Sequence, residues 1–277
     1  MDDLYLSVKF NVRPIYGVEI LMAELSYLGF EMFEENQNNL TAYIKDSNFT
    51  ENIFNEVRVL NSGEFKIGYK ISKVHNKNWN EKWEKDYNVV DISKDCTIRA
   101  PFHKPSKKFF DIIIKPEMSF GTGHHETTQL MIEYILDQNL INKKVCDVGC
   151  GTGILSIISE KKGAKFVDAV DIDPNCCKNT LDNLKRNNCK NINTIHSSSD
   201  KLIGNYYDLI LSNITLNNLK DNFENFKKIS TQKTIIIISG FFEKDLIDIN
   251  KILKKLQLEI KDFKKKNNWV AARYYYK

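Results

Sequence analysis

The sequence of 277 residues contains no apolar run long enough to cross a bilayer. Its longest apolar stretches, such as Ile235–Ile238, have only the length of a strand, whereas a membrane-spanning helix needs about 20 apolar residues. The first ten residues, MDDLYLSVKF, place acidic residues where a secretory signal carries positive charge. We therefore expect a protein that works in the cytoplasm and has no membrane partner.

The sequence also lacks a disulfide framework, a strong charge excess and internal repeats. Its six cysteines have no regular spacing, and in a cytoplasmic protein we expect them to be small buried or half-buried thiols. The net charge of +4 is too small to hold a protein on nucleic acid by itself. The lysine clusters at 104–108 and 261–266 are expected to be solvated. We therefore expect no direct nucleic-acid binding, and a monomeric chain.

Residues 1–75 alternate short strands with helices. Apolar and polar residues alternate from Leu4 to Phe10, as is typical of a half-buried strand. A helix with apolar residues three and four apart is expected from Pro14 to the terminating Gly29. A hairpin (30–33 with 40–44), a second helix (51–60) and a strand (65–74) complete the order βαββαβ. This order predicts a ferredoxin-like α+β domain, which by itself indicates no function.

Residues 76–90 are predicted to form a polar linker helix. Trp79, Trp83 and Tyr87 are spaced four apart and would share one helix face. We expect this aromatic stripe to dock on a neighbouring domain. Ordinary core packing without a role in binding is the alternative.

Residues 91–277 are predicted to form the second domain. From Lys143 onward strands alternate with helices that start near Gly153, Pro174 and Leu216, a pattern typical of a parallel sheet covered on both faces. Strands are expected at 144–148, 166–171, 192–196, 207–212, 234–239, 256–263 and 269–276. The last two flank a turn at 265–268, as an antiparallel final strand requires. We predict an α/β fold with a doubly wound, Rossmann-like sheet of seven strands, the last antiparallel.

The strongest motif joins the first of these strands to its helix. Residues 145–153, VCDVGCGTG, place three glycines at alternate positions between strand and helix. Such a loop lets the backbone turn sharply and present free N–H groups to a ligand. The next strand ends in Asp171, 22 residues after Gly149, where an acid accepts hydrogen bonds from two ribose hydroxyls. The glycine-rich loop and Asp171 together indicate a ligand that contains adenosine.

The glycine spacing distinguishes between adenosine cofactors. A dinucleotide-binding loop would need its third glycine at position 154, which is Ile; the glycine comes one residue earlier, at Gly153. With Asp147 before the turn, the loop resembles the D-x-G-x-G-x-G of S-adenosylmethionine methyltransferases. We therefore expect Gly149, Gly151 and Asp171 to bind S-adenosylmethionine. A strand–turn–helix without a ligand is the alternative.

Residues 120–128, FGTGHHETT, form a second candidate segment. Phe120 and the hydroxyls of Thr127 and Thr128 are expected to form a lid or cradle for the amino-acid end of the cofactor. His125 is a candidate catalytic base, with a structural histidine as the alternative. No metal is expected, because adjacent histidines such as His124 and His125 cannot easily bind one ion together and no other ligand has suitable spacing.

Asn213 ends the strand at 207–212 and is the main catalytic candidate. Its amide oxygen could accept a hydrogen bond from an amine and so direct the nitrogen lone pair at a methyl group. The alternative is that Asn213 caps the following helix. Gly149, Asp171 and Asn213 should converge beyond the carboxyl ends of the strands.

Taken together, these motifs resemble the PrmA family of bacterial methyltransferases, which modify the large-subunit ribosomal protein numbered eleven. The resemblance covers nearly the whole chain and includes the small first domain and the motifs NWNEKW (78–83), FGTG (120–123), TT (127–128), DVGCG (147–151), DIDP (171–174), NI (213–214) and SG (239–240). It implies that Thr128, Gly149, Asp171 and Asn213 contact the cofactor, and that the first domain recognises the protein substrate. It also implies methylation of lysine side chains and of an α-amino group.

Three departures from the family leave substrate choice open. The chain has His124-His125-Glu126 where Thr-His-Pro is common, Thr215 where Leu is common, and a short first domain. One alternative is a methyltransferase of the same fold that acts on RNA or a small amine, although the first domain contains only two arginines, Arg13 and Arg58. Another is a non-catalytic ribosome-associated binding protein, which would not need the cofactor-binding acid.

Overall fold

The computed structural model describes residues 5–14, 16–36, 39–74, 87–117 and 119–277. The chain divides into two compact units, residues 1–87 and 88–277. The predicted linker helix lies largely outside the described residues, including Trp79 and Trp83. No helix in the described part is both long enough and apolar enough to span a membrane.

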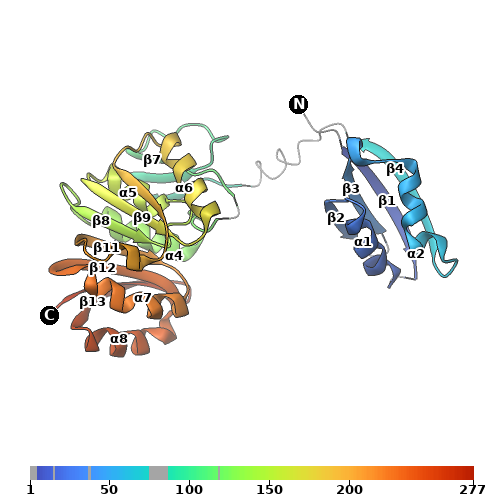
Figure 1. Cartoon of the computed structure of the whole chain (residues 1–277). Helices are drawn as coiled ribbons and strands as arrows, with labels where there is room; N and C mark the ends of the chain where they lie inside the picture. The colour runs from blue at the N-terminus through green and yellow to red at the C-terminus, as the bar shows by residue number, and fades with distance from the viewer. Residues whose placement is uncertain (1–4, 15, 37–38, 75–86, 118) are drawn as a thin grey trace. The chain divides into compact units, whose positions relative to one another are not determined.

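The N-terminal unit is a four-stranded antiparallel sheet with helices on one side (Figure 1). The strand order is β2-β3-β1-β4, and the elements follow the predicted βαββαβ order. Their bounds are β1 Tyr5–Arg13, α1 Gly17–Tyr27, β2 Met32–Asn36, β3 Asn39–Lys45, α2 Arg58–Asn61 and β4 Lys66–Val74.

The second helix of this unit is shorter than predicted. Residues Glu51–Glu56 form a 3₁₀ helix, and the extended backbone of Val57 separates it from α2. The Asn61 side chain donates hydrogen bonds to the carbonyls of Phe54 and Val57. A side chain that bonds carbonyls in this way competes with a continuous helix.

The C-terminal unit contains the predicted seven-stranded sheet, in the order β10-β9-β8-β11-β12-β14-β13. Strand β14 is antiparallel to both of its neighbours, while the pairs from β10 to β12 are parallel. The predicted antiparallel last strand is therefore confirmed. The bounds are β8 Lys144–Val148, β9 Phe166–Asp171, β10 Ile192–His196, β11 Tyr207–Asn213, β12 Ser230–Phe242, β13 Leu258–Lys266 and β14 Trp269–Tyr276.

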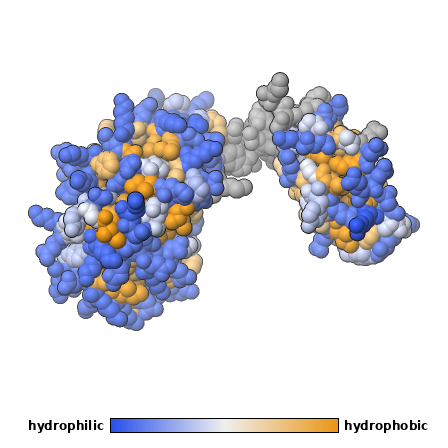
Figure 2. All heavy atoms as spheres, viewed as in Figure 1, coloured by the Kyte–Doolittle hydropathy of each residue, from blue (hydrophilic) through white to orange (hydrophobic). Residues whose placement is uncertain are grey.

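Helices cover both faces of this sheet because its central strands are apolar on both faces. Leu209 and Leu211 of β11 enter one core with residues of α4, α5 and α6, whereas Ile210 enters the other with residues of α7 and α8. The separate layers are visible in Figure 1, and Figure 2 shows a mainly hydrophilic surface with separate apolar patches. The helices are α4 Glu126–Leu136, α5 Ile154–Lys161, α6 Pro174–Arg186, α7 Leu216–Lys228 and α8 Leu246–Lys255.

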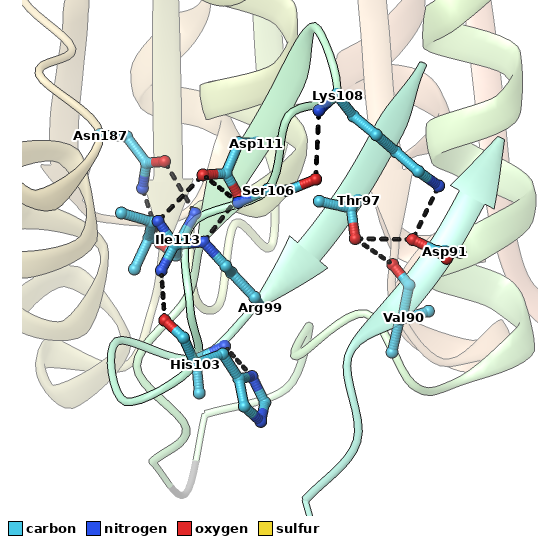
Figure 3. Close-up of polar contacts among 11 residues, drawn as sticks. Val90, Asp91, Thr97, Arg99, His103, Ser106, Lys108, Asp111, Ile113 and Asn187 are labelled. Carbon is cyan, nitrogen blue, oxygen red and sulfur yellow. Dashed lines mark hydrogen bonds and ion pairs between the residues drawn. The ribbon is translucent and has the colours of Figure 1, made fainter. Parts of the chain in front are cut away.

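A small three-stranded sheet precedes α4 and was not predicted. It consists of β5 Val90–Ser93, β6 Cys96–Arg99 and β7 Phe110–Ile113. The Arg99 guanidinium makes a bidentate ion pair with Asp111, at 2.7 and 2.9 Å. Asn187, the residue directly after α6, makes two hydrogen bonds to the backbone of Ile113 (Figure 3). These contacts fasten the small sheet to α6 and fix the start of the segment that leads to residues 120–125.

Candidate active site

The glycine-rich loop joins β8 to α5 at the carboxyl edge of the large sheet. Gly149 and Gly151 have positive φ angles of 78° and 55°. A Cβ at Gly149 would lie 2.2 Å from the Ile214 side chain, and one at Gly151 would lie 2.3 Å from the carbonyl oxygen of Phe120. Glycine is therefore required here by backbone conformation and by close packing, in addition to any contact with a ligand.

Asp171 ends β9 beside this loop, as predicted. Its Oδ2 accepts a hydrogen bond from the Gly151 amide at 2.9 Å, and its Oδ1 accepts one from the Asp173 amide at 3.0 Å. The carboxylate thereby fixes the position of the glycine-rich loop. It also lines a cavity next to that loop.

Asp147, which immediately precedes the loop, is fully buried. Its Oδ2 accepts hydrogen bonds from the amide and the hydroxyl of Ser156, at 3.2 and 2.7 Å. Its Oδ1 has no hydrogen-bond partner among the described residues. Burial, which penalises the charged form, raises the pKa of the Asp147 carboxyl to about 7.

The segment before α4 lies against the glycine-rich loop. The carbonyl of Phe120 accepts a hydrogen bond from the Thr152 amide at 3.0 Å, and the carbonyl of Gly121 accepts one from the Thr152 hydroxyl at 2.6 Å. Two segments about 30 residues apart in sequence therefore form one wall of the cavity. The role of this segment as a cradle for the amino-acid end of the cofactor stays a prediction.

His125 is the N-cap residue of α4. Its Nδ1 accepts a hydrogen bond from the Thr127 amide at 3.2 Å. The same nitrogen lies 2.8 Å from the Thr127 hydroxyl. Its ring lies between Phe120 and Trp269, with centroid distances of 5.3 and 4.9 Å. This arrangement makes His125 part of an aromatic wall.

Asn213 ends β11 and borders the cavity, with 9% of its surface exposed. Its Nδ2 donates to the Thr128 hydroxyl at 3.4 Å, while its Oδ1 has no hydrogen-bond partner among the described residues. The N-cap residue of α7 is Thr215, so the Asn213 side chain does not cap that helix. The amide is thus held by one end, and its buried oxygen has no hydrogen-bond partner among the described residues.

The cavity has a volume of about 530 Å³, within the range typical of small-molecule sites. Seven of the eight predicted residues line it: Phe120, His125, Thr127, Gly149, Gly151, Asp171 and Asn213. The eighth, Thr128, is fully buried and contacts Asn213 instead. Within the described residues, no group of three or more His, Cys, Asp or Glu side chains could hold a metal ion.

Several lining residues were not predicted from the sequence. Ile172 directly follows the acid and is 70% exposed, a property that its sequence position does not reveal. Trp269 lies at the start of β14, and no sequence motif around it indicates a residue of the site. The others are Val148, Val170, Cys176, Ser197, Ser198, Ser199, Ile214, Thr215, Asn218, Asp221, Asn222 and Gly240.

The strand order and the loop define the class of protein. A sheet in this order, with a glycine-rich loop and an acid at neighbouring strand ends, is the Rossmann-like fold of methyltransferases. A solved structure titled ribosomal protein L11 methylase, from Lactobacillus delbrueckii subsp. bulgaricus, is similar to this chain. The TM-score is 0.64 and the identity 27%, covering 69% of this chain and 100% of that one.

The sequence comparisons identify the family. Residues 17–275 match the family model described as Ribosomal protein L11 methyltransferase (PrmA). Relatives named ribosomal protein L11 methyltransferase occur in Bacteroides thetaiotaomicron, with 35% identity over 98% of this chain and 99% of theirs, and in Porphyromonas gingivalis, with 36% identity over 92% and 90%. The chain belongs to the PrmA family of methyltransferases.

Proposed function

We propose that this chain transfers methyl groups from S-adenosylmethionine to lysine side chains or the N-terminal amine of ribosomal protein L11, the protein named in its relatives. The observation that carries the proposal is the free Oδ1 of Asn213. Asn213 lines the same cavity that the glycine-rich loop and Asp171 border, and its unpartnered oxygen would have to be reached from there. A hydrogen-bond acceptor on Asn213 can bind the N–H group of an amine nucleophile.

The residues present fit S-adenosylmethionine. Asp171 would bond the ribose hydroxyls, and Ile172, exposed beside it, offers an apolar surface for the adenine. Gly149 and Gly151 line the cavity without side chains that would separate their backbone from a ligand. The bound cofactor supplies an electrophilic methyl group on a sulfonium.

Asn213 would orient the amine, and the aromatic wall of Phe120, His125 and Trp269 would favour its neutral form. Asn213 Oδ1 accepts one amine N–H, which fixes the direction of the lone pair, and Thr128 holds the Asn213 amide in that orientation. Orientation of this kind is worth up to ~7–11 kcal/mol. A lysine amine in water has a pKa of ~10.4 and must lose a proton before it can react. The apolar rings of Phe120 and Trp269 favour the neutral amine by excluding water.

In this proposal no side chain serves as a dedicated base, and the amine releases its proton to water as it enters. His125 is then a positioning residue, because its ring packs against both Phe120 and Trp269. The N-terminal unit would recognise the protein substrate, as the family resemblance implies. Because ribosomal proteins are its substrates, the enzyme would act in the cytoplasm.

The proposal is tested by incubating the protein with isotopically labelled S-adenosylmethionine and purified ribosomal proteins. Mass spectrometry then locates the label. We expect it on amines of L11. Label on RNA or on small amines instead would contradict the proposal, as would the absence of any transfer.

The cofactor is tested separately by calorimetry on Asp171→Ala. We expect binding of S-adenosylmethionine to weaken by ~1.5–3 kcal/mol, or about 10- to 150-fold, because hydrogen bonds to a charged acceptor are lost. Asp173→Ala is the matched control, since Asp173 caps α6 and does not line the cavity. Equal affinities for both variants would remove Asp171 from the site.

A further inference from the structure

Gly151 in the glycine-rich loop is held by side chains at both of its polar groups. Its amide donates a hydrogen bond to Asp171 Oδ2 at 2.9 Å, and its carbonyl accepts one from the Thr180 hydroxyl, also at 2.9 Å. Gly151 lines the cavity and has a φ of 55°. Because a glycine can adopt many backbone conformations, these two side chains select one of them.

The peptide group between Gly151 and Thr152 is bound at both of its edges. Its carbonyl oxygen accepts from Thr180, and its N–H donates to the Phe120 carbonyl at 3.0 Å. Thr180 belongs to α6, whereas Phe120 lies before α4. One peptide group therefore connects three segments, and two of the residues that it connects, Gly151 and Phe120, line the cavity.

The Thr180 side chain is fully buried, and its two branches contact different residues of the loop. The hydroxyl also lies 3.4 Å from Cys150 Sγ. A carbonyl oxygen can only accept, so the hydroxyl proton is directed at Gly151 and the thiol is the donor in the contact with Cys150. The methyl group lies beside Gly153, where a Cβ would be 2.8 Å from Thr180 Cγ2. The hydroxyl orients the loop, and the methyl group packs against it.

Loss of the Thr180 hydroxyl would disturb both sides of this peptide group. Gly151 is buried, and a buried carbonyl that loses its partner is unfavourable, so the group would turn toward another donor. The peptide group is planar, and its C=O and N–H therefore turn together. The N–H would then move away from the Phe120 carbonyl, and two parts of the cavity wall would shift at once.

We propose that Thr180 is a positioning residue for S-adenosylmethionine, although Thr180 itself does not line the cavity. Its hydroxyl keeps the peptide group between Gly151 and Thr152 in the orientation in which the glycine-rich loop and Phe120 can both contact the cofactor. This role rests on the proposed use of S-adenosylmethionine. It belongs to a residue in the middle of α6 that the sequence motifs do not include.

Two substitutions separate the hydroxyl from the methyl group. Thr180→Val replaces the hydroxyl by a methyl group of similar size, whereas Thr180→Ser keeps the hydroxyl and removes the methyl group. Calorimetry on the full-length protein measures the Kd for S-adenosylmethionine, and a thermal melt of the same samples measures the Tm. We expect the Kd to rise about 2- to 10-fold in Thr180→Val, which loses one hydrogen bond, and to be nearly unchanged in Thr180→Ser. Thr180→Ser should nevertheless lower the Tm, because a buried methyl group is lost.

The matched control is Thr234→Val. Thr234 is also buried, and its hydroxyl donates to the Tyr207 carbonyl at 2.6 Å. Tyr207 begins β11, whose other end, Asn213, borders the cavity. The control therefore removes the same kind of hydrogen bond at the opposite edge of the sheet, and the Kd should stay unchanged whatever the effect on the Tm.

A normal Kd in Thr180→Val would overturn the role of Thr180 alone. An equal rise in Thr180→Ser would also overturn it, since the hydroxyl would then not be responsible, and so would an equal rise in Thr234→Val, which would indicate a general loss of stability. Absence of S-adenosylmethionine binding by the unmodified protein would overturn the proposed function, and the role of Thr180 with it. Calorimetry uses no methyl acceptor, so these results do not depend on L11 being the substrate.

Discussion

At the scale of single residues, the Asn213 amide is held by one end and free at the other. Thr128 accepts from its Nδ2, and its Oδ1 has no partner among the described residues. Buried polar atoms normally have partners, so each exception needs an explanation. A substrate amine that completes the hydrogen bonding is the explanation we favour.

Asn213→Ala should therefore lower turnover far more than stability. By analogy with the loss of one oxyanion donor, the loss amounts to ~2.7–4 kcal/mol, or about two to three orders of magnitude in rate. Single-turnover methylation and a thermal melt measure both quantities on one sample. Ser212→Ala is the matched control: it loses a 2.9 Å bond to the Val148 carbonyl, so stability should fall and turnover should not. Normal turnover in Asn213→Ala would contradict the catalytic role.

Asp147 makes the stability of the protein depend on pH. Burial raises the pKa of its carboxyl from the usual 3.8 to about 7. The protonated form is therefore favoured in the folded state, and its contribution to stability is complete below pH 3.8 and is lost as the pH rises through about 7. Each unit of pKa difference corresponds to about 1.4 kcal/mol.

In Asp147→Asn this loss of stability between about pH 4 and pH 7 should disappear. The amide oxygen can still accept from Ser156, so the variant should fold. Urea unfolding at several pH values gives the free energy of unfolding for each protein. Asp248→Asn, an exposed carboxylate on α8, should retain the slope of the unmodified protein. Parallel curves for all three proteins would show that Asp147 does not titrate in this range.

At the scale of elements, α4 and the β13–β14 hairpin are held together by a row of polar contacts. Helix residues three and four apart lie on one face, and here that face points to the hairpin. The contacts are Glu126 with Asn267 at 2.7 Å, Gln129 with Lys266, and both Glu133 and Asp137 with Lys264. The row fixes the turn that precedes Trp269 and so places Trp269 beside His125.

Glu126→Ala should loosen this turn and reduce kcat/KM. Loss of one hydrogen bond of ~0.5–1.5 kcal/mol corresponds to about 2- to 10-fold. Glu126→Gln keeps an acceptor for Asn267 and should restore most of the activity. Lys251→Ala, which breaks the exposed pair with Asp248 on α8, is the control and should have normal kinetics. If Glu126→Gln is as impaired as Glu126→Ala, the charge of Glu126 and not its bond to Asn267 is what matters.

At the scale of the whole molecule, each unit has its own hydrophobic core. One apolar cluster lies within the N-terminal unit, and two clusters cover the two faces of the C-terminal sheet. The similar structure from Lactobacillus delbrueckii aligns in full to 69% of this chain, close to the share that residues 88–277 represent. Separate cores indicate that the C-terminal unit can fold by itself.

Deletion of residues 1–87 should therefore leave cofactor affinity unchanged and impair methylation of L11. Loss of even one dominant interface contact costs ~2 kcal/mol, or about 30-fold in kcat/KM. Calorimetry with S-adenosylmethionine and a methylation assay with L11 measure the two effects. A normal rate in the shortened enzyme would show that the N-terminal unit does not recognise the substrate. Loss of cofactor binding would contradict the independence of the units.

The sequence determined the parts of this protein that depend on local pattern. Apolar runs bounded by turns predicted the seven strands, and the glycines at 149, 151 and 153 predicted the loop between β8 and α5, because strand and turn preferences act over a few residues. Only the tertiary structure decided which distant segments meet. It placed Trp269 beside His125, Thr128 behind Asn213 and Lys9 opposite Lys70. Such pairings follow from strand order and register, which are set by packing of the whole sheet and not by nearby residues.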